Sequence, residues 1–548
     1  MFCQILPVSK ADNRLHCMPV SLRRAPIDIR TFQQRGYAPS TTLRLSTCEL
    51  TRPMANIQLR ISAHNLDDES LLNVFYFCRS SAIGKDENGN VLWEHWSRER
   101  WWNKLIHVCK RWRSLILGSP LRLDISLVCT RGTPVADMLA HSPLFPLVID
   151  YDYNNHDYTI GDEEGIMLAL QHRDRLRSIC LSMPTSSLQK LIATMGDKFP
   201  MLQYLRIEPL TRRNIHLILP MAFEAPHLRH LILNHFASPI GSALLTSAVG
   251  LVTLTLWWTH PSTYPPINHV LQTLSLLHRL ETLEIGFRSP VPKRVIQRQL
   301  SHMPIVTHVT LPNLHWFAFR GISAYLEALL PQMTTPALKT LNVYFFNELR
   351  FSVPCFLQFM MTTGNLTFSG VRFLFHRDAV AVFAYPSPED RLVNFYVEVA
   401  CRHLDWQLSS VSQIFNTLGS LFYTVIDLTL DYREHTFSPE WHNQADRTQW
   451  RELLGSFRNV KTLRVHQGLV DDLSHSLRLD GEPTLQVLPE LQELVCPPAC
   501  IYDQAFAPFI LERRVAGRPI FLIGKDFPAG HGTYTFHSSI GVSYIGPD

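Results

Sequence analysis

The chain has 548 residues, of which 46% are hydrophobic and 18% are charged. This composition supplies a large apolar core and excludes a disordered or collagen-like chain. The 51 basic and 47 acidic residues give a net charge of +4. Residues 1–53 hold eight of the basic and three of the acidic residues, so the rest of the chain has a net charge of −1. Because domains that bind nucleic acid normally show a basic patch, we expect no nucleic-acid partner.

Residues 1–55 form a basic leader that is rich in Arg, Ser and Thr. Mitochondrial transit peptides have a similar composition. Pro7, Pro19, Pro26 and Pro39 interrupt the leader, however, so a disordered tail or an extension of the gene model is the other interpretation. The eleven cysteines have no regular spacing and no secretory signal precedes them, which predicts reduced thiols and a cytoplasmic or nuclear protein.

Two amphipathic helices are predicted next, at residues 65–75 and 101–118, with a polar insert at 79–100 between them. The first opens with cap-type residues and places Leu71, Leu72 and Phe75 on one face. The apolar face of the second consists of Trp102, Leu105, Ile106, Cys109, Trp112 and Ile116. Two helices this short need a partner surface, which is either the rest of this chain or another protein.

A Leu-x-x-Leu-x-Leu pattern then recurs through the body of the chain. Its ten copies start at Leu176, Leu202, Leu228, Leu251, Leu280, Val306, Leu338, Val425, Val460 and Leu491. The first six starts are 23–29 residues apart, as in leucine-rich repeats, and a gap of 87 residues precedes the copy at Val425.

Each copy predicts a short strand whose fourth and sixth pattern positions point to one side. Several of the segments between copies have helical spacing, for example 188–195, 325–330 and 450–457. One strand and one helix cannot bury both apolar faces, but stacked copies bury a continuous core. The fold class is therefore α/β, a short helical module at 56–125 followed by an irregular strand–helix solenoid at 126–523. A wound α/β domain with coincidental Leu spacing is the alternative.

The strand residues that point away from the core predict a binding surface on the concave face of the solenoid. They are Arg206, Glu208, Asn234, Trp257, Glu284, Tyr344, Asp431, Arg464 and His466. Mixed charge with isolated aromatics suits a protein partner, because Tyr, Trp and Arg are the usual anchors of protein interfaces. Any one of these residues is alternatively part of an ordinary solvated strand face.

Other features predict no further site. Residues 236–259 lack charged side chains and are long enough to span a bilayer, but Pro239, Gly241 and Gly250 and their place in the array favour buried core over a membrane span. Neither the three histidines of HLRHLILNH at 227–235 nor the CPPAC thiols at 496–500 offer a complete metal site. We expect no metal and no cofactor.

Sequence signatures of enzymes are also missing. The sequence contains no G-x-S-x-G, no H-E-x-x-H and no P-loop, so no catalytic residue is predicted, and a hydrolase with carboxylates from distant positions is a remote alternative. Beyond the array, a helical stretch at 505–516 and an apolar run at 519–523 are expected to cap the open end. A loosely ordered tail is expected at 524–548.

The helical module resembles the F-box, which docks a Skp-type adaptor of cullin-based ubiquitin ligases. The resemblance implies that the adaptor would bind Leu66, Leu71, Leu72, Phe75, Leu105, Val108, Cys109, Trp112 and Leu115. Two departures from the F-box pattern are Asp67, where a proline is usual, and the insert at 79–100.

The wider chain, from about residue 66 to 519, is similar to an expanded group of F-box-like proteins from mushroom-forming fungi, through phrases such as WWNKLIHVCKRWR and HLDWQLSSVSQIF. The resemblance implies a non-enzymatic substrate receptor, in which the module binds the adaptor and the repeats bind a protein substrate. The alternative is a non-catalytic repeat scaffold whose F-box serves only as a structural cap.

Overall fold

The structure is a computed structural model that describes residues 66–80, 101–120, 122–142, 144–151, 159–210, 217–258, 264–288, 290, 308–387, 393–432, 447–477, 487–502 and 504–525. The predicted leader, all but the first two residues of the predicted insert and nearly all of the predicted tail lie outside these residues. The described residues belong to one compact unit, 66–548.

The strands of the described residues form a main sheet of sixteen strands and a second sheet of two. In spatial order the main sheet contains β1 (Leu127–Cys129), β2 (Leu147–Tyr151), β3 (Leu176–Met183), β4 (Tyr204–Pro209), β5 (His230–Asn234), β6 (Thr253–Trp258), β7 (Thr282–Phe287), β9 (Trp316–Gly321), β11 (Thr340–Phe345), β14 (Phe395–Ala400), β13 (Ala379–Tyr385), β12 (Gly370–Phe375), β15 (Asp427–Tyr432), β16 (Thr462–Val465), β17 (Glu493–Cys496) and β18 (Phe521–Gly524). The second sheet pairs β8 (Val309–Thr310) with β10 (Met333–Thr334).

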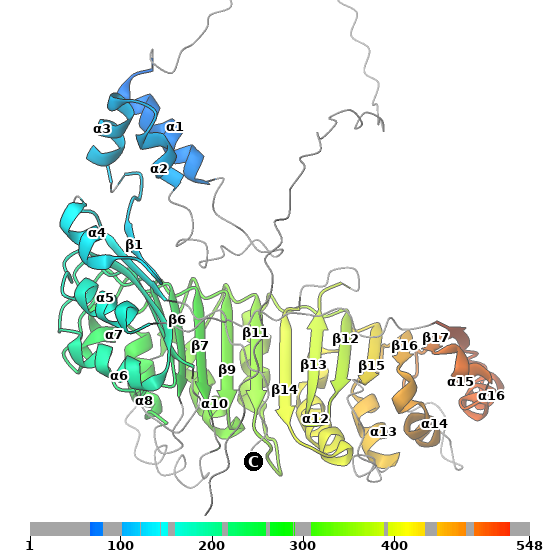
Figure 1. Ribbon diagram of the computed structural model, residues 1–548. Helices are drawn as coiled ribbons and strands as arrows, with labels where there is room; N and C mark the ends of the chain where they lie inside the picture. Colours follow the sequence, from blue (N-terminus) through cyan, green and yellow to red (C-terminus); the bar gives the residue numbers. More distant parts are fainter. Residues whose placement is uncertain are drawn as a thin grey trace, which may run out of the picture. The chain divides into compact units, whose positions relative to one another are not determined.

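Helices connect most of the strands and lie along one side of the main sheet (Figure 1). Neighbouring helices such as α12, α13 and α14 also pack on one another. The helices are α1 (Asp68–Ser80), α2 (Trp101–Ile106), α3 (Lys110–Gly118), α4 (Val135–His141), α5 (Ile160–Leu170), α6 (Thr185–Thr194), α7 (Ala243–Ser247), α8 (Ile267–Leu274), α10 (Ser323–Leu329), α11 (Pro354–Thr363), α12 (Leu404–Leu418), α13 (Arg447–Gly455), α14 (Val470–Leu477), α15 (Pro498–Tyr502) and α16 (Ala507–Val515). The predicted α/β class is thus confirmed.

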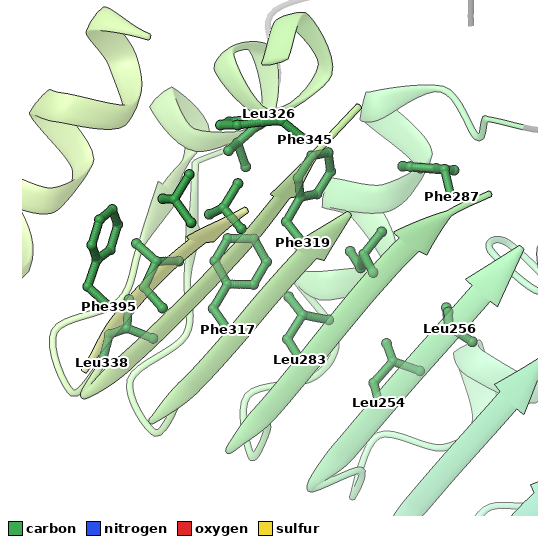
Figure 2. Close-up of a cluster of buried hydrophobic side chains, with 14 of the residues drawn as sticks. Leu254, Leu256, Leu283, Phe287, Phe317, Phe319, Leu326, Leu338, Phe345 and Phe395 are labelled. Carbon is green, nitrogen blue, oxygen red and sulfur yellow. The ribbon is translucent and has the colours of Figure 1, made fainter. Parts of the chain in front are cut away.

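The Leu pattern has the structural role that the sequence predicts. Leu254 and Leu256 of β6, and Leu283 of β7, are fully buried, and Figure 2 shows them in one layer with Phe317 and Phe319 of β9. Side chains of a strand alternate between its two sides, so the residues between these positions point away from the helices. Stacking of the copies builds one core that continues from α1 to the last strand.

The copy predicted at Val306 is wrong as a strand of the main sheet. Of its described residues, Val309 and Thr310 form β8, which pairs with β10 in the small sheet. The main-sheet strand is β9, where the pattern LHWFAF from Leu314 has phenylalanine at the fourth and sixth positions. A pattern restricted to aliphatic residues overlooks this copy, although buried phenylalanine fills the same layer.

The gap of 87 residues before Val425 contains a local reversal of strand direction. Strand β14 pairs in parallel with β11, β12 pairs in parallel with β15, and β13 runs antiparallel between β12 and β14. Every other neighbouring pair among the described main-sheet strands is parallel. Three strands therefore fill the place where the repeat pattern is interrupted.

The helix predicted at 101–118 is broken in the structure. It forms α2 and α3, and Cys109 between them has an extended backbone. Trp102 packs edge-on against Phe145, while Trp112 packs edge-on against Phe75 of α1. The two indoles thus contact different parts of the chain, and the break lets both do so.

The end of the array agrees with the sequence. The predicted helix at 505–516 is α16, and the apolar run at 519–523 leads into β18, which pairs in parallel with β17. Of residues 236–259, which lack charges, the described ones (236–258) form α7, β6 and their connections. Within the described residues, no helix is both long and apolar enough to cross a membrane.

Candidate functional site

The candidate site lies on the open face, by which we mean the side of the main sheet that points away from the helices. Residues between the buried Leu positions supply its side chains, and the parallel register places equivalent residues of neighbouring strands beside one another. Asn234 of β5 pairs with Trp257 of β6, and Glu284 of β7 pairs with Thr255 on one side and Ala318 on the other. Neighbouring strands are about 4.8 Å apart, so these side chains form a continuous surface.

All nine residues predicted for the concave face are on strands of this sheet or directly after one, and they fall into two groups. Most of the charged ones are already paired within the chain. Arg206 contacts Glu208 at 3.1 Å, and Arg464 contacts Asp427 at 2.8 Å. Asp431 pairs with Arg372 of the neighbouring β12. His466 accepts a hydrogen bond through Nδ1 from the backbone of Gly468.

The remaining predicted residues, Asn234, Trp257, Glu284 and Tyr344, lie in the centre of the open face, on β5 to β11. Asn234 and Glu284 are buried. Oδ1 of Asn234 and Oε2 of Glu284 make no hydrogen bond within the described part of the chain, although the polar hydrogens of Trp257, Thr255 and Trp316 act on the Glu284 carboxyl group. The same is true of Nε1 of Trp257. Buried polar atoms without partners are rare in folded proteins, and each one is a candidate for ligand contact.

Two residues that the sequence analysis overlooked complete this group. Trp316 of β9 and Asn342 of β11 each have a buried polar atom, Nε1 and Oδ1, that makes no hydrogen bond with any described residue. We call Asn234, Trp257, Glu284, Trp316 and Asn342 the Glu284 cluster. Trp316 was missed because the sequence predicted the strand of this repeat from Val306 onward, whereas the main-sheet strand begins at Trp316. Asn342 occupies the fifth pattern position, as Glu284 does, so comparing that position across the copies would have found it.

The electrostatics of the cluster centre on one carboxyl group. Glu284 is 4% exposed, and burial raises its pKa to about 7. The polar hydrogens of Trp257, Thr255 and Trp316 oppose this increase because they favour the charged form. The carboxyl group therefore changes charge near neutral pH, which is unusual for a glutamate.

Tyr344 and its neighbours border the cluster. Its ring lies 5.2 Å from that of Tyr396, whose hydroxyl donates a hydrogen bond to Glu398. Burial, followed by the negative charges of Glu398 and Glu284, raises the pKa of Tyr344, while Arg320 on the adjacent β9 lowers it. The open face thus carries aromatic rings on both sides of Glu284.

A glycine determines the position of one indole. The ring of Trp257 lies over Gly286 of β7, where a Cβ atom would come within 2.3 Å of the indole Cε3. We expect Gly286→Ala to displace this indole and to lower the free energy of unfolding by about 1–3 kcal/mol, the usual cost of overpacking. Near-ultraviolet circular dichroism and denaturant unfolding measure both effects.

Gly250→Ala is the matched control for that variant, because a Cβ atom at Gly250 meets nothing within 4 Å. It lies in the connection that leads into β6. If both variants unfold alike and leave the tryptophan signal unchanged, the position assigned to the Trp257 indole is wrong.

The helical module is packed on the same chain. Of the residues that the F-box resemblance assigns to adaptor binding, Leu71, Leu72 and Phe75 are buried, and Val108 is 57% exposed. The others are half-buried: Leu66, Leu105, Cys109, Trp112 and Leu115. Asp67, which replaces the usual proline, accepts a hydrogen bond from the backbone of Ser70 and so caps the first turn of α1.

Of the residues considered above as metal ligands, His230 is half-buried, and Cys496 and Cys500 are buried. His230 contacts the Thr253 hydroxyl at 3.1 Å, and burial lowers its pKa to about 4. Cys496 and Cys500 are buried free thiols, and burial raises the pKa of Cys496 to about 11. No group of three or more metal-binding side chains comes together in the part of the chain that the structure describes.

The main sheet, parallel except at β13, the helices on one side of it and the recurring Leu pattern resemble a solenoid of the leucine-rich-repeat type. A solved structure that the chain is similar to is the leucine-rich-repeat-containing protein LegL7 from Legionella pneumophila, with 12% identity over 74% of this chain and 99% of that one. Its TM-score of 0.25 is too low for this likeness to carry an argument. No protein-family model and no curated protein matches the chain.

Proposed function

We propose that the chain is a protein-recognition scaffold whose open face binds a partner protein. The observation that carries the proposal is the Glu284 cluster, in which three polar side chains and two indoles each have a buried polar atom without a hydrogen bond among the described residues. The charged side chains on both sides of the cluster already form ion pairs within the chain. Interface hot spots typically combine such aromatic anchors with desolvated polar groups.

Selection of binders from a random peptide library tests this function. The intact chain should enrich peptides, and the double variant Trp257→Ala with Tyr344→Ala should lose most of them. Trp406→Ala is the control, because Trp406 is an exposed aromatic on α12, on the helix side of the sheet. Peptides that bind the double variant as well as the intact chain would contradict the proposal.

The more specific proposal is a substrate receptor of a cullin-type ubiquitin ligase, with the helical module as its adaptor-binding part. It is supported by the F-box resemblance and by apolar side chains that remain exposed on the module, namely Val74, Tyr76 and Phe77 of α1 and Val108. A receptor of this kind needs no chemistry of its own, because it raises the effective concentration of the substrate near the ligase.

Co-purification with a Skp-type adaptor tests this second part. Leu72→Asp would place a charge in the core and unfold the module, so the informative variant is Phe77→Glu with Val108→Glu at exposed positions. We expect this double variant to lose the adaptor at least tenfold, because a charge at the centre of an apolar contact costs more than about 1.4 kcal/mol.

Leu349→Glu is the control for the adaptor experiment, since Leu349 is 94% exposed and lies outside the module. If the wild-type chain retains no adaptor, the module is a structural cap, and the proposed scaffold function stands without the ligase.

A further inference from the structure

Some charged residues of the open face form ion pairs within the chain, and others do not. At one end Arg206 pairs with Glu208, and at the other Asp431 pairs with Arg372 and Arg464 with Asp427. Even the hydroxyl of Tyr396 is bonded, to Glu398. In contrast, Glu284 has no basic side chain that pairs with it among the described residues, and its Oε2 makes no hydrogen bond there.

The unpaired atoms of the cluster favour one kind of ligand chemistry. Three are acceptors, namely Oε2 of Glu284 and Oδ1 of Asn234 and of Asn342. Two indoles lie on either side of the carboxyl group, one from β6 and one from β9. Acceptor oxygens beside aromatic rings suit a cation, which gains from charge-assisted hydrogen bonds and from the ring faces.

Other ligand classes fit this arrangement less well. An anion would meet the carboxyl group of Glu284, and no described basic side chain contributes to the electrostatics of that group. A purely apolar group would leave the buried acceptors unpaired, and each unpaired acceptor costs about 1–3 kcal/mol. A neutral hydrogen-bonding group is the closest competitor, and the experiment below includes it.

Resting on the proposed function, we infer that the Glu284 cluster is the part of the open face that binds a basic side chain, arginine or lysine, of the partner protein. Glu284 accepts the charge-assisted hydrogen bonds, and Trp257 and Trp316 of the two flanking strands lie beside its carboxyl group. The carboxyl group is then stabilised in its charged form when the partner is bound.

The test uses the full chain and three small probes: N-acetyl-arginine amide, N-acetyl-lysine amide and the neutral isostere N-acetyl-citrulline amide. Binding is followed through the indole N–H resonances of chain labelled at tryptophan, which are assigned with Trp257→Phe and Trp316→Phe. We expect a basic probe to shift both resonances at millimolar concentration and to bind at least about tenfold more tightly than citrulline. The two basic probes show which source of the cation is preferred.

The decisive variant is Glu284→Gln, which keeps the size of the side chain and should weaken the basic probe about tenfold or more. Glu163→Gln is the matched control, because Glu163 of α5 pairs with Lys190 at 3.0 Å on the helix side. Gly286→Ala is a second variant that moves Trp257 and leaves Glu284 in place, and it too should weaken the probe.

The pH dependence gives an independent readout. Burial raises the pKa of Glu284 to about 7, so basic probes should bind roughly tenfold more tightly at about pH 8 than at about pH 6. Tyr344 of β11 interacts electrostatically with Glu284, and it also interacts with Glu398 of β14 and with Arg320 of β9. Tyr344 stays neutral over this range because its own pKa is raised.

Equal binding of the arginine and citrulline probes, no binding of either basic probe, or unchanged binding in Glu284→Gln would overturn the inference. The proposed scaffold function is separable from it. If library peptides bind the open face but contain no essential basic residue, the scaffold function stands and the inference about the Glu284 cluster fails.

Discussion

Replacing Trp450 with alanine is expected to lower the free energy of unfolding by about 3–5 kcal/mol, the usual cost of deleting a large buried aromatic side chain. Trp450 lies on α13 and is fully buried, and its ring packs edge-on against Phe375 of β12 at 5.7 Å. The substitution leaves a cavity between the helix layer and the main sheet, and the surrounding core closes it only partly.

The loss of stability in Trp450→Ala should be confined to the repeats around α13, because a repeat contacts mainly its neighbours. We therefore expect faster hydrogen exchange in α12, α13 and α14 and unchanged protection in β3 to β6. Denaturant unfolding gives the free energy, and exchange followed by mass spectrometry gives its location. Uniform loss of protection along the array would contradict a modular core.

Two control variants separate packing from other effects. Trp450→Phe keeps most of the apolar area and removes Nε1, which makes no hydrogen bond to another described residue, so its cost should be well below that of alanine. Glu452→Ala changes an exposed residue of the same helix and should stay within about 0.5 kcal/mol of wild type.

Glu284→Gln is expected to stabilise the chain at alkaline pH. The pKa of Glu284 rises from 4.5 to about 7 on folding, because burial disfavours the charge. A group whose pKa is raised in the folded state contributes its full stability below about pH 4.5 and loses it as the pH rises through about 7. The difference corresponds to about 3 kcal/mol when the carboxyl group is fully ionised.

Denaturant unfolding at several pH values between about 5 and 8 measures this linkage. The wild-type chain should lose stability across the range, and Glu284→Gln should lose about 3 kcal/mol less. Glu163→Gln, on the helix side of the sheet, should follow the wild type. If the variant and the wild type show the same pH dependence, Glu284 is not the buried, unpaired acid that the structure describes.

Much of the fold could be predicted because leucine spacing reports directly on burial. Leu254 and Leu283 occupy the fourth pattern position and lie fully buried, as the pattern predicts. The same argument placed Trp257 and Glu284 on the opposite side. Side chains alternate between the two sides of a strand whatever strand lies beside it. Local sequence is therefore sufficient to predict which side of the strand a residue faces.

The rest depends on pairing between distant segments, which local spacing does not report. Strand β14 lies beside β11 although β12 and β13 precede it in the chain, and nothing in its own sequence specifies that order. The ion pair of Arg372 with Asp431 arises from the same pairing. Asp431 was therefore predicted as a contact residue although its charge is already matched.

The candidate site was predicted only in part, because local sequence does not show which polar side chains have partners on neighbouring strands. Sequence alone identified Asn234, Trp257 and Glu284 as outward-facing residues, but it could not tell a paired polar group from an unpaired one. That distinction requires the positions of Trp316 and Asn342 on the neighbouring strands. What distinguishes the centre of the open face is its buried polar atoms without hydrogen bonds, and not only that its side chains point away from the core.

Photo-cross-linking of a library-selected peptide to the chain is the most direct test of the claim that the open face is a protein-recognition surface. The peptide carries a diazirine side chain, and mass spectrometry identifies the cross-linked residues. We predict cross-links on outward-facing residues between β5 and β11, lost in Trp257→Ala with Tyr344→Ala. Cross-links confined to α10, α12 and α13, on the helix side, would contradict the account.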